Sequence, residues 1–510
     1  MKRYDTIIIG SGNGGLVSAL RLANNGKKVL VLEKNNTPGG LSTSFLRGRF
    51  EFDVSMNSLH EYGTKENPGS VYKLFEDLNI IDKIKFAEIK DAYHVFSSDS
   101  QKDFVMPFGI DNYILKMNEY VPNSKKSLEE FFALAQECYE AIVYLESNEE
   151  ASAEVLGELY PNFMRAVTFS VSKVLNNLNM PFKAQEILTA NWTYFGSPTN
   201  TLSFVHFAAM FYSYIAKGAQ IPRKTSYEIS LILADAIEKK KGEIKYLAEV
   251  DKILFENSQV LGVKLMSGEE YYADYIICDI SPNAVYGKMI SPENLPENAI
   301  KLTNSRVLGA RAFSIYLGLN QEASKIGLKD FSYFIYHSLN SNKEYERMNN
   351  LENDNSMAIV VNNANPSCSP KGTCIMQLTT LFNGDCFDKS VSLENYFALK
   401  EQIAENIIAN FEKTTGIFLR EYIEEIAIAT PVTYARYGGY PGGSIYGYKA
   451  TGMDNLVPRI KSSLNENYIP NLEFCGGFGD FLSGCGATYL SGNRAALKIL
   501  EHMEKEINNE

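Results

Sequence analysis

Glycines gather near the start of the chain in the hexapeptide Gly10-Ser11-Gly12-Asn13-Gly14-Gly15. Gly10 permits a tight turn, Gly12 leaves room for the backbone to approach a pyrophosphate, and Gly15 lets a helix pack closely against a strand. The N-terminus of such a helix offers unpaired N–H groups and a positive dipole end to phosphate groups. The pattern therefore predicts a dinucleotide site, provided that a strand precedes it and a helix follows.

An acid and a second glycine pair come next along the chain. Glu33 ends a short apolar run and is followed by Lys34. A carboxylate at this place accepts hydrogen bonds from ribose hydroxyls and repels a 2′-phosphate, so it favours FAD or NAD over NADP. The stretch Pro38-Gly39-Gly40-Leu41-Ser42 fits either an ordinary hairpin turn or a second approach of the backbone to the cofactor.

The elements around the turn have the order that the motif requires. Residues 4–9 and 29–32 are short apolar runs rich in β-branched side chains, which is typical of buried parallel strands. Between them, apolar residues repeat at helical spacing over 16–23, and Gly26 is placed to end that helix. Strand, helix and strand predict one βαβ unit, with Glu33 at the end of its second strand.

A second glycine-rich block lies near the C-terminus. Residues 471–477 read as a strand that ends in Gly476 and Gly477, and the segment Gly484-Cys485-Gly486-Ala487-Thr488 precedes a predicted helix. Small residues allow close approach to a flavin ring, and the positive end of a helix suits the flavin edge where negative charge develops on reduction. A glycine-tolerant terminal helix without a ligand is the plain structural alternative.

The bulk composition describes an ordinary globular protein of more than one packed unit. The chain has 510 residues, 45% of them hydrophobic, and a formal net charge of −12 with no massed Lys and Arg. We therefore expect no nucleic-acid partner. The 7 cysteines include no CxxC pair, so no metal site or disulfide framework is expected. No secretion signal and no membrane-spanning run is recognised, which makes the cytoplasm the expected location, with membrane association left open.

The middle of the chain alternates between helical and strand-like stretches. Residues 76–217 are expected to form a helical region, with helices over 128–145, 153–178 and 202–216. Strands are expected at 243–246, 250–255, 260–266 and 275–278, then at 311–317, 358–361 and 373–379. The polar stretch 340–355 is expected to be a surface loop, and 393–411 an amphipathic helix.

Taken together, these blocks resemble the FAD-dependent phytoene desaturase, carotenoid isomerase and retinol saturase superfamily, which is related to the amine oxidases. The resemblance spans nearly the whole chain and is strongest at residues 5–63, 218–282 and 430–500. It implies FAD as the cofactor, held by the two glycine turns and the C-terminal block, with a backbone group near Val250 on the adenine. The family usually has an acid where Gly477 stands; Asp480 is the candidate substitute.

The same resemblance directs attention to four residues beside the flavin. His60, Tyr437 and Tyr446 are candidates for moving a proton, and Arg436 for holding a polar group or stabilising charge. A structural role for His60 remains open. Phe204, Phe207, Phe211 and Tyr214 share one face of the expected helix 202–216 and could line a substrate tunnel or fill a core.

The expected fold is α/β: a Rossmann-type FAD-binding domain of residues 1–75, 218–300 and 425–510, with a discontinuous substrate domain of residues 76–217 and 301–424 that mixes sheet and helix. The expected function is desaturation, saturation or isomerisation of C=C bonds in an apolar polyene, isoprenoid or lipid. An amine oxidase and a non-catalytic flavin- or lipid-binding protein are the alternatives. No second dinucleotide motif is present, so the electron partner stays open, as does the oligomeric state.

Overall fold

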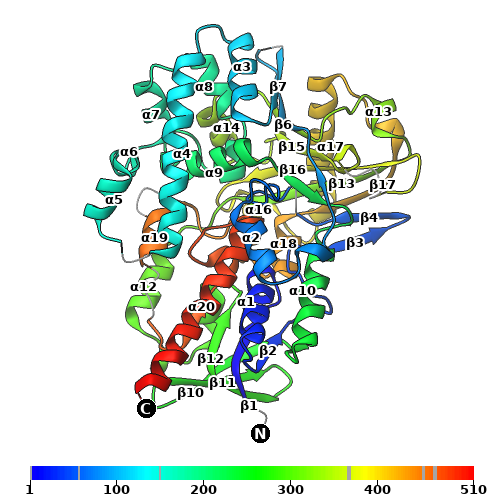
Figure 1. The fold of residues 1–510 in the computed structure, drawn as a ribbon. Coiled ribbons are helices and arrows are strands. Elements are labelled where there is room, and N and C mark those ends of the chain that lie inside the picture. Colours follow the sequence, from blue (N-terminus) through cyan, green and yellow to red (C-terminus); the bar gives the residue numbers. More distant parts are fainter. Residues whose placement is uncertain are drawn as a thin grey trace.

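The computed structural model describes residues 3–55, 58–100, 102–148, 151–364, 369–450, 454–462 and 468–509. Two seven-stranded sheets and two short strand pairs make up its β-structure. Figure 1 shows the first sheet and its helices at the end of the molecule where both termini lie, and the second sheet at the opposite end. The functional site lies between the two sheets.

The first sheet is built around the predicted βαβ unit. Its order is β10-β11-β12-β1-β2-β9, and β18 also pairs with β12. Strands β9, β2, β1, β12 and β18 are parallel to one another, and β10 and β11 form an antiparallel hairpin whose β11 pairs antiparallel with β12. The strands are β1 Arg3–Ile9, β2 Val29–Leu32, β9 Glu243–Lys245, β10 Val250–Glu256, β11 Gln259–Leu265, β12 Glu270–Cys278 and β18 Leu472–Phe474.

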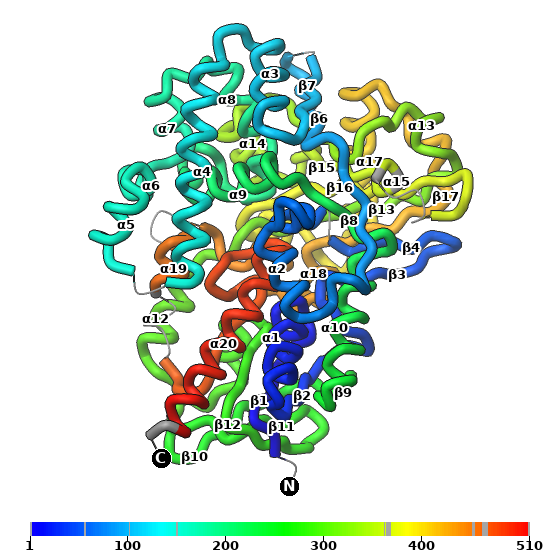
Figure 2. The backbone as a smooth tube through the Cα atoms, in the orientation of Figure 1, coloured from blue at the N-terminus to red at the C-terminus, as the bar shows by residue number. Residues whose placement is uncertain are grey.

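Alternating side chains of this sheet enter two different cores. Ile8 and Ile277 pack against helices, whereas Ile7 and Ile276 pack against the β10–β11 hairpin and the segment that follows β12. Both faces are therefore buried, as expected for a parallel sheet. The covering helices are α1 Asn13–Asn24, α2 Ser70–Asp77, α10 Tyr227–Lys239 and α20 Cys485–Asn509. Helices α1 and α20, from opposite ends of the chain, lie side by side (Figure 2).

The second sheet has the order β17-β13-β16-β15-β14-β6-β7, and only the β14–β6 pair is parallel. Phe313 and Leu378 face helix α17, while Tyr316 and Met357 face the helical layer on the other side. The elements are β6 Asp91–Ser97, β7 Lys102–Pro107, β13 Arg311–Leu319, β14 Ser332–Tyr336, β15 Ser356–Val360, β16 Cys374–Phe382, β17 Ile423–Ala429 and α17 Tyr396–Thr415.

The helical layer over the second sheet differs in one place from what the sequence predicts. The expected single helix over 153–178 is three short helices, because Pro161 supplies no N–H to a continuing helix and Ser170 caps a new one by accepting from Lys173 N. The layer consists of α3 Ile110–Tyr120, α4 Lys125–Ser147, α5 Ala153–Leu159, α6 Pro161–Ala166, α7 Val171–Asn177, α8 Phe182–Leu188 and α9 Phe204–Lys217.

Two further expectations need correction. The region 76–217 is not purely helical, since β6 and β7 complete the second sheet and β5 (Phe86–Glu88) pairs with β8 (Gln220–Pro222). The expected loop 340–355 contains helix α14 (Ser341–Arg347), which begins where the Asn340 side chain accepts from two backbone N–H groups. The other strands and helices expected from the sequence are confirmed, with shifts of a few residues at their ends.

The remaining elements join these layers. They are the hairpin β3 Ser44–Arg47 and β4 Phe50–Asp53, and the helices α11 Pro282–Ala284, α12 Glu297–Ser305, α13 Ala323–Ile326, α15 Val361–Ala364, α16 Cys386–Ser390, α18 Pro431–Gly438 and α19 Leu456–Ser462. Within the described ranges, no helix combines the length and apolar character needed to cross a bilayer. The same ranges contain no cluster of three His, Cys, Asp or Glu side chains suited to a metal ion.

The contact between α1 and α20 depends on the absence of one side chain, which gives a direct test. A Cβ atom at Gly492 would lie 2.1 Å from the carbonyl oxygen of Gly14. Gly492→Ala should therefore lower the free energy of unfolding by about 2 kcal/mol, as overpacking does. Gly157→Ala is the matched control: its Cβ meets nothing within 4 Å, and helix propensity should raise stability slightly. Equal melting temperatures for both variants would contradict the packing described.

Candidate active site

The first wall of the site is the glycine turn between β1 and α1. Gly10 has a φ of 98°, which a side chain disfavours, and a Cβ atom at Gly15 would lie only 2.2 Å from the Gly10 carbonyl oxygen. A Cβ at Gly14 would lie 2.6 Å from the backbone nitrogen of Gly476. Gly14 and Gly15 thus serve the close packing of the turn against its neighbours.

Glu33 organises this turn from the end of β2. Its Oε2 accepts hydrogen bonds from the backbone N of Ser11 at 2.9 Å and from Ser11 Oγ at 2.7 Å, and its Oε1 accepts from Asn35 N at 2.8 Å. Each carboxylate oxygen has two lone pairs, so the group can hold the turn and still accept from a ligand hydroxyl. The expected ribose contact of Glu33 stays a prediction.

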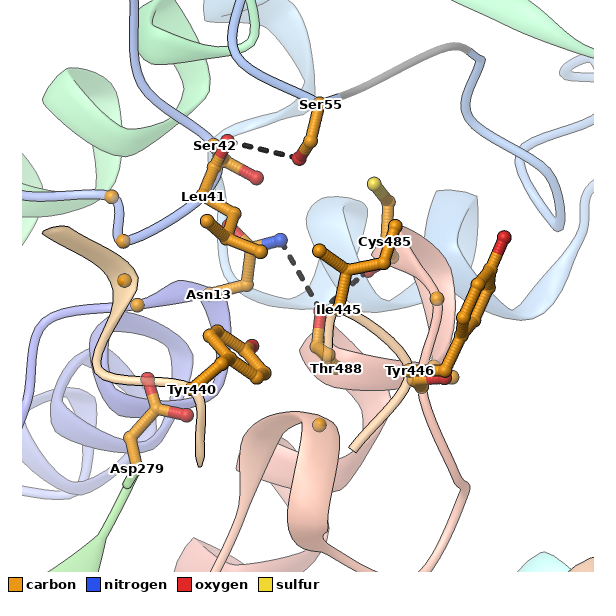
Figure 3. Close-up of a pocket in the computed structure, with 18 of the residues that line it drawn as sticks. Asn13, Leu41, Ser42, Ser55, Asp279, Tyr440, Ile445, Tyr446, Cys485 and Thr488 are labelled. Carbon is orange, nitrogen blue, oxygen red and sulfur yellow. Dashed lines mark hydrogen bonds between the residues drawn. The ribbon is translucent and has the colours of Figure 1, made fainter. Parts of the chain in front are cut away.

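The second glycine pair lies directly against the first turn. Gly39 N donates to the carbonyl oxygen of Ser11 over 2.8 Å, and a Cβ at Gly40 would come within 3.2 Å of Gly12 Cα. The start of α20 closes the site from the other side, where Asn13 Nδ2 donates to Thr488 Oγ1 over 3.2 Å (Figure 3). Three segments far apart in the sequence therefore form one cradle.

One cavity of about 420 Å³ extends from this cradle to the second sheet. Most residues expected from the sequence line it: Gly10, Gly12, Asn13, Glu33, Lys34, Gly39, Gly40, Leu41, Ser42, His60, Val250, Tyr437, Tyr446, Gly477, Gly486, Ala487 and Thr488. Gly14, Gly15, Arg436 and Asp480 are not among its lining residues. The cavity thus joins the predicted cofactor turn to the predicted substrate side without a break.

Asp480 points away from the cavity into ion pairs. Its Oδ2 lies 3.1 Å from Arg494 Nε and 3.1 Å from Lys498 Nζ, both on α20. A carboxylate held by two cations in this way fixes α20 to the preceding loop. The geometry therefore does not support Asp480 as a substitute for an acid at Gly477.

The four residues singled out for chemistry occupy different surroundings. His60 lines the cavity, accepts or donates a 3.0 Å hydrogen bond with Ser58 Oγ, and stacks on Tyr214 at 4.6 Å. Burial lowers the pKa of His60 to about 4, so the imidazole is neutral near pH 7. Tyr446 also lines the cavity and donates to the carbonyl oxygen of Thr193 over 2.9 Å.

Arg436 and Tyr437 lie at the outer edge of the site. The Tyr437 side chain is 62% exposed, and its backbone oxygen accepts from Asn35 Nδ2 over 3.1 Å. The exposed Arg436 guanidinium lies 5.6 Å from the Tyr437 ring. Neither side chain is enclosed with the substrate side of the cavity, so the structure offers no support for a chemical role.

The aromatic stripe of α9 fills a core instead of a tunnel. Phe207 and Phe211 are fully packed against each other and against Phe131 of α4. The residues by which α9 reaches the cavity are Ala209 and Met210. The rest of the cavity wall on this side contains Tyr194, Tyr446 and Phe481, which are separate in sequence.

Asp279 is a site residue that sequence reasoning missed. It follows β12 directly, lines the cavity beside Tyr440 (Figure 3), and accepts a hydrogen bond on Oδ2 from Gly15 N at 2.9 Å. A Cβ at Gly12 would lie 2.5 Å from the same oxygen. Its position right after a predicted strand was a usable signal, because carboxyl ends of parallel strands meet at one edge of a sheet.

Asp279 has an unusual protonation equilibrium. Burial is the main cause that raises the pKa of Asp279 to about 7; the charge of Glu33 acts in the same direction, and N–H donation from Gly15 and Gly12 acts in the opposite one. The other titratable groups facing Asp279 are Tyr440, Cys278 and Cys475. No cation pairs with this carboxyl in the described ranges.

Polar residues of the second sheet were missed as well. Ser314 on β13, Gln377 and Thr379 on β16, and Tyr434 on α18 line the far end of the cavity. For Gln377 and Thr379 the available signal was their spacing of two in the expected strand 373–379, which places both on one face.

Comparisons with known proteins agree with this geometry. A model of the flavin-containing amine oxidoreductase family matches residues 14–500. All-trans-retinol 13,14-reductase of Danio rerio is 25% identical, covering 96% of this chain and 86% of that protein. Prolycopene isomerase 2 of an Oncidium hybrid cultivar is 26% identical, covering 90% of this chain and 77% of that protein.

Solved structures share the fold. Wild-type putrescine oxidase bound to putrescine aligns with a TM-score of 0.66 at 13% identity, covering 98% of this chain and 99% of that one. Cyclohexylamine oxidase from Brevibacterium oxydans aligns with a TM-score of 0.63 at 16% identity, with the same coverage of 98% and 99%. At these identities the likeness concerns the fold alone.

The residues present fit a flavin dinucleotide. The turn carries glycines where a side chain would obstruct a pyrophosphate, and the N-cap residue Gly12 has no side chain to occupy the first N–H groups of α1, of which that of Gly15 donates to Asp279. Asn13 Oδ1 is buried and finds no hydrogen-bond donor in the described part of the chain, so it is available to a ligand. FAD is the cofactor that this cradle takes.

The Asp279 carboxyl makes a pH prediction. It is neutral below its pKa of about 7 and ionised above it, where its charge would repel a pyrophosphate held on the neighbouring turn, by roughly 3 kcal/mol for two unit charges about 5 Å apart at an effective dielectric constant of about 20. The dissociation constant of FAD should therefore rise from pH 6 to pH 8.5, by up to about tenfold per pH unit above pH 7. Quenching of FAD fluorescence by deflavinated protein measures this dependence.

Asp279→Asn keeps the size and an acceptor oxygen but removes the titration, so its FAD affinity should be nearly independent of pH over this range. Asp480→Asn, which changes an acid outside the cavity, should retain the wild-type slope. A pH-independent affinity in the wild-type protein, or an unchanged slope in Asp279→Asn, would overturn the role of this carboxyl.

Proposed function

The chain belongs to the flavin-containing amine oxidoreductase family, and on that premise we propose that it desaturates, saturates or isomerises C=C bonds of an apolar polyene, isoprenoid or lipid. One observation carries the proposal: a single cavity joins the flavin cradle to a wall made mostly of aromatic, aliphatic and hydroxyl side chains, with Glu61 and Glu146 as its acids. An apolar substrate gains from leaving water for such a wall, whereas a charged one loses solvation.

The similarity to named enzymes supports the same choice. The retinol reductase and the prolycopene isomerase are named for substrates with conjugated C=C bonds, and both align over 90% or more of this chain. We propose that this chain shares that substrate class.

The chemistry that a bound flavin would supply is the transfer of a hydride to or from a substrate carbon. We propose that the cradle residues hold it: Gly10, Gly12, Asn13, Gly14, Gly15, Glu33, Lys34, Gly39, Gly40, Leu41, Ser42, Val250, Gly477, Gly486, Ala487 and Thr488. His60, neutral and stacked on Tyr214, then orients the substrate side and excludes water. Because the imidazole of His60 is neutral, it cannot act as an imidazolium acid. We propose that the proton which a saturation adds to the substrate comes from a hydroxyl group of the cavity wall instead.

We propose that the protein works in the cytoplasm at the periphery of a membrane. A long apolar polyene partitions into lipid, so a protein that uses it gains from contact with a lipid surface. Leu159, Phe169 and Phe182 of the segment from α5 to α8 are exposed apolar side chains that suit such contact.

The second candidate function is amine oxidation, which one specific observation favours. Glu61 and Glu146 line the same cavity, and carboxylates attract ammonium groups. Burial, with a contribution from Glu61, raises the pKa of Glu146 to about 8. Because Glu146 is then largely uncharged near pH 7, the wall attracts a cation less than its composition suggests.

Product analysis separates the candidates. Holoprotein is incubated with all-trans-retinol or a carotenoid under a reductant and, separately, an oxidant; the account expects a mass shift of two hydrogens, or an unchanged mass at a new retention time if the reaction is isomerisation. Parallel incubations with putrescine and benzylamine under oxygen should release no hydrogen peroxide.

Gly15→Ala is the matched control. Its Cβ would meet the Gly10 backbone oxygen, so the variant should lose both FAD and product formation. Peroxide release on an amine, with no change in any polyene, would replace the proposed function by amine oxidation. Bound flavin that no polyene and no amine affects would favour a non-catalytic binding protein.

A further inference from the structure

The far end of the cavity carries polar side chains where apolar ones would suit a hydrocarbon better. Ser314 and Thr379 are cross-strand partners on β13 and β16, and Gln377 lies on the same face two residues along β16 from Thr379. These side chains are 0%, 6% and 6% exposed, and all three line the cavity. We call this group, together with Tyr434, the polar floor.

The hydroxyl groups of the polar floor form a hydrogen-bonded chain that ends at Thr379. Tyr434 Oη donates to Ser314 Oγ over 2.8 Å, and Ser314 Oγ lies 2.9 Å from Thr379 Oγ1. Tyr316 Oη, 3.1 Å from Tyr434 Oη, donates to the backbone oxygen of Val54. Either hydroxyl can donate in the contact between Ser314 and Thr379, and when Ser314 donates, the Thr379 hydrogen is left for a group in the cavity.

Gln377 contributes a free acceptor beside the Thr379 hydroxyl. Its Nε2 donates to the Val54 carbonyl oxygen at 3.4 Å and to Thr379 Oγ1 at 3.3 Å. Its Oε1 receives no hydrogen bond from any residue within the described ranges. Buried polar atoms are normally paired, so an unpaired amide oxygen beside a hydroxyl group on a cavity wall indicates a ligand group that can pair with both.

The ligand group that would pair with Thr379 and Gln377 is uncharged. No ion pair involves the polar floor within the described ranges, and burial raises the pKa of Tyr434, which keeps its phenol neutral. The adjoining wall is Met357, Tyr446 and Leu456. A carboxylate or ammonium group would find no counter-charge there, whereas an alcohol donates one hydrogen bond and accepts another.

We propose that Thr379 and Gln377 bind the hydroxyl group of an apolar alcohol, so that the substrate is a polyene or isoprenoid alcohol and not a hydrocarbon. This inference rests on the proposed function and specifies its substrate class. The substrate hydroxyl donates to Gln377 Oε1 and accepts from the hydroxyl pair of Ser314 and Thr379. Anchoring one end of the chain on the second sheet sets which double bond reaches the flavin side of the cavity.

The test compares two probes that differ by one oxygen. All-trans-retinol and its deoxy analogue, in which a methyl group replaces the hydroxymethyl group, are titrated into holoprotein and their polyene fluorescence gives dissociation constants. Wild-type protein should bind the alcohol at least about tenfold more tightly, since the analogue leaves buried polar groups unpaired. Thr379→Val and Gln377→Leu should each reduce that ratio about fivefold or more, mainly by weakening alcohol binding.

Two variants control for altered packing. Thr379→Ser restores a hydroxyl and should restore the wild-type ratio. Met357→Leu changes an apolar side chain of the same wall at similar volume and should leave the ratio unchanged even if both affinities shift. Circular dichroism and melting temperature identify any variant that fails to fold, and the remaining variants then carry the comparison.

Equal affinity of wild-type protein for the two probes would overturn the inference and leave the proposed function standing, since a polyene would still bind. An unchanged ratio in both folded variants, Thr379→Val and Gln377→Leu, would overturn it too, because the preference would then arise elsewhere. Binding of neither probe would contradict the proposed function itself, and the inference with it.

Discussion

The structure depends on backbone meeting backbone where β1, α1 and α20 converge. A Cβ atom at Gly15 would clash with the carbonyl oxygen of Gly10, and a Cβ atom at Gly492 would clash with the carbonyl oxygen of Gly14. With no side chains in between, the C-terminal helix reaches the first turn of the chain, and Asn13 donates to Thr488 across the contact. The cradle for the cofactor exists because these segments approach so closely, and the cavity opens from that cradle toward the second sheet.

Burial then determines the charge of the cavity wall. It raises the pKa of Asp279 and Glu146 and lowers that of His60, so that each group shifts toward its uncharged form near pH 7. A wall with fewer charged groups suits an apolar substrate on one side, and a protonated Asp279 suits an anionic pyrophosphate on the other. The same cause thus serves both ends of the cavity, and it leaves selectivity to hydrogen bonds of neutral groups such as Thr379 and Gln377.

Local features of the sequence were sufficient for the cofactor side. The turn at Gly10–Gly15, the acid Glu33 and the strands around them follow from short-range rules of backbone geometry and side-chain period, and the structure places them as expected. The break of the expected helix 153–178 also had a local cause at Pro161. What escaped were contacts between distant segments: Asp279 reaches Gly15 across 264 positions. Whether the α9 aromatics pack in a core or line a cavity depends on neighbours such as Phe131, which periodicity does not identify.

The central claim is that this cradle holds FAD at the head of a substrate cavity. The most direct measurement is the absorbance spectrum of the purified protein, followed by quantification of the flavin released on denaturation. The account predicts a yellow protein that releases FAD at about one equivalent per chain and is bleached by a reductant. A colourless protein that cannot be reconstituted with FAD would contradict it.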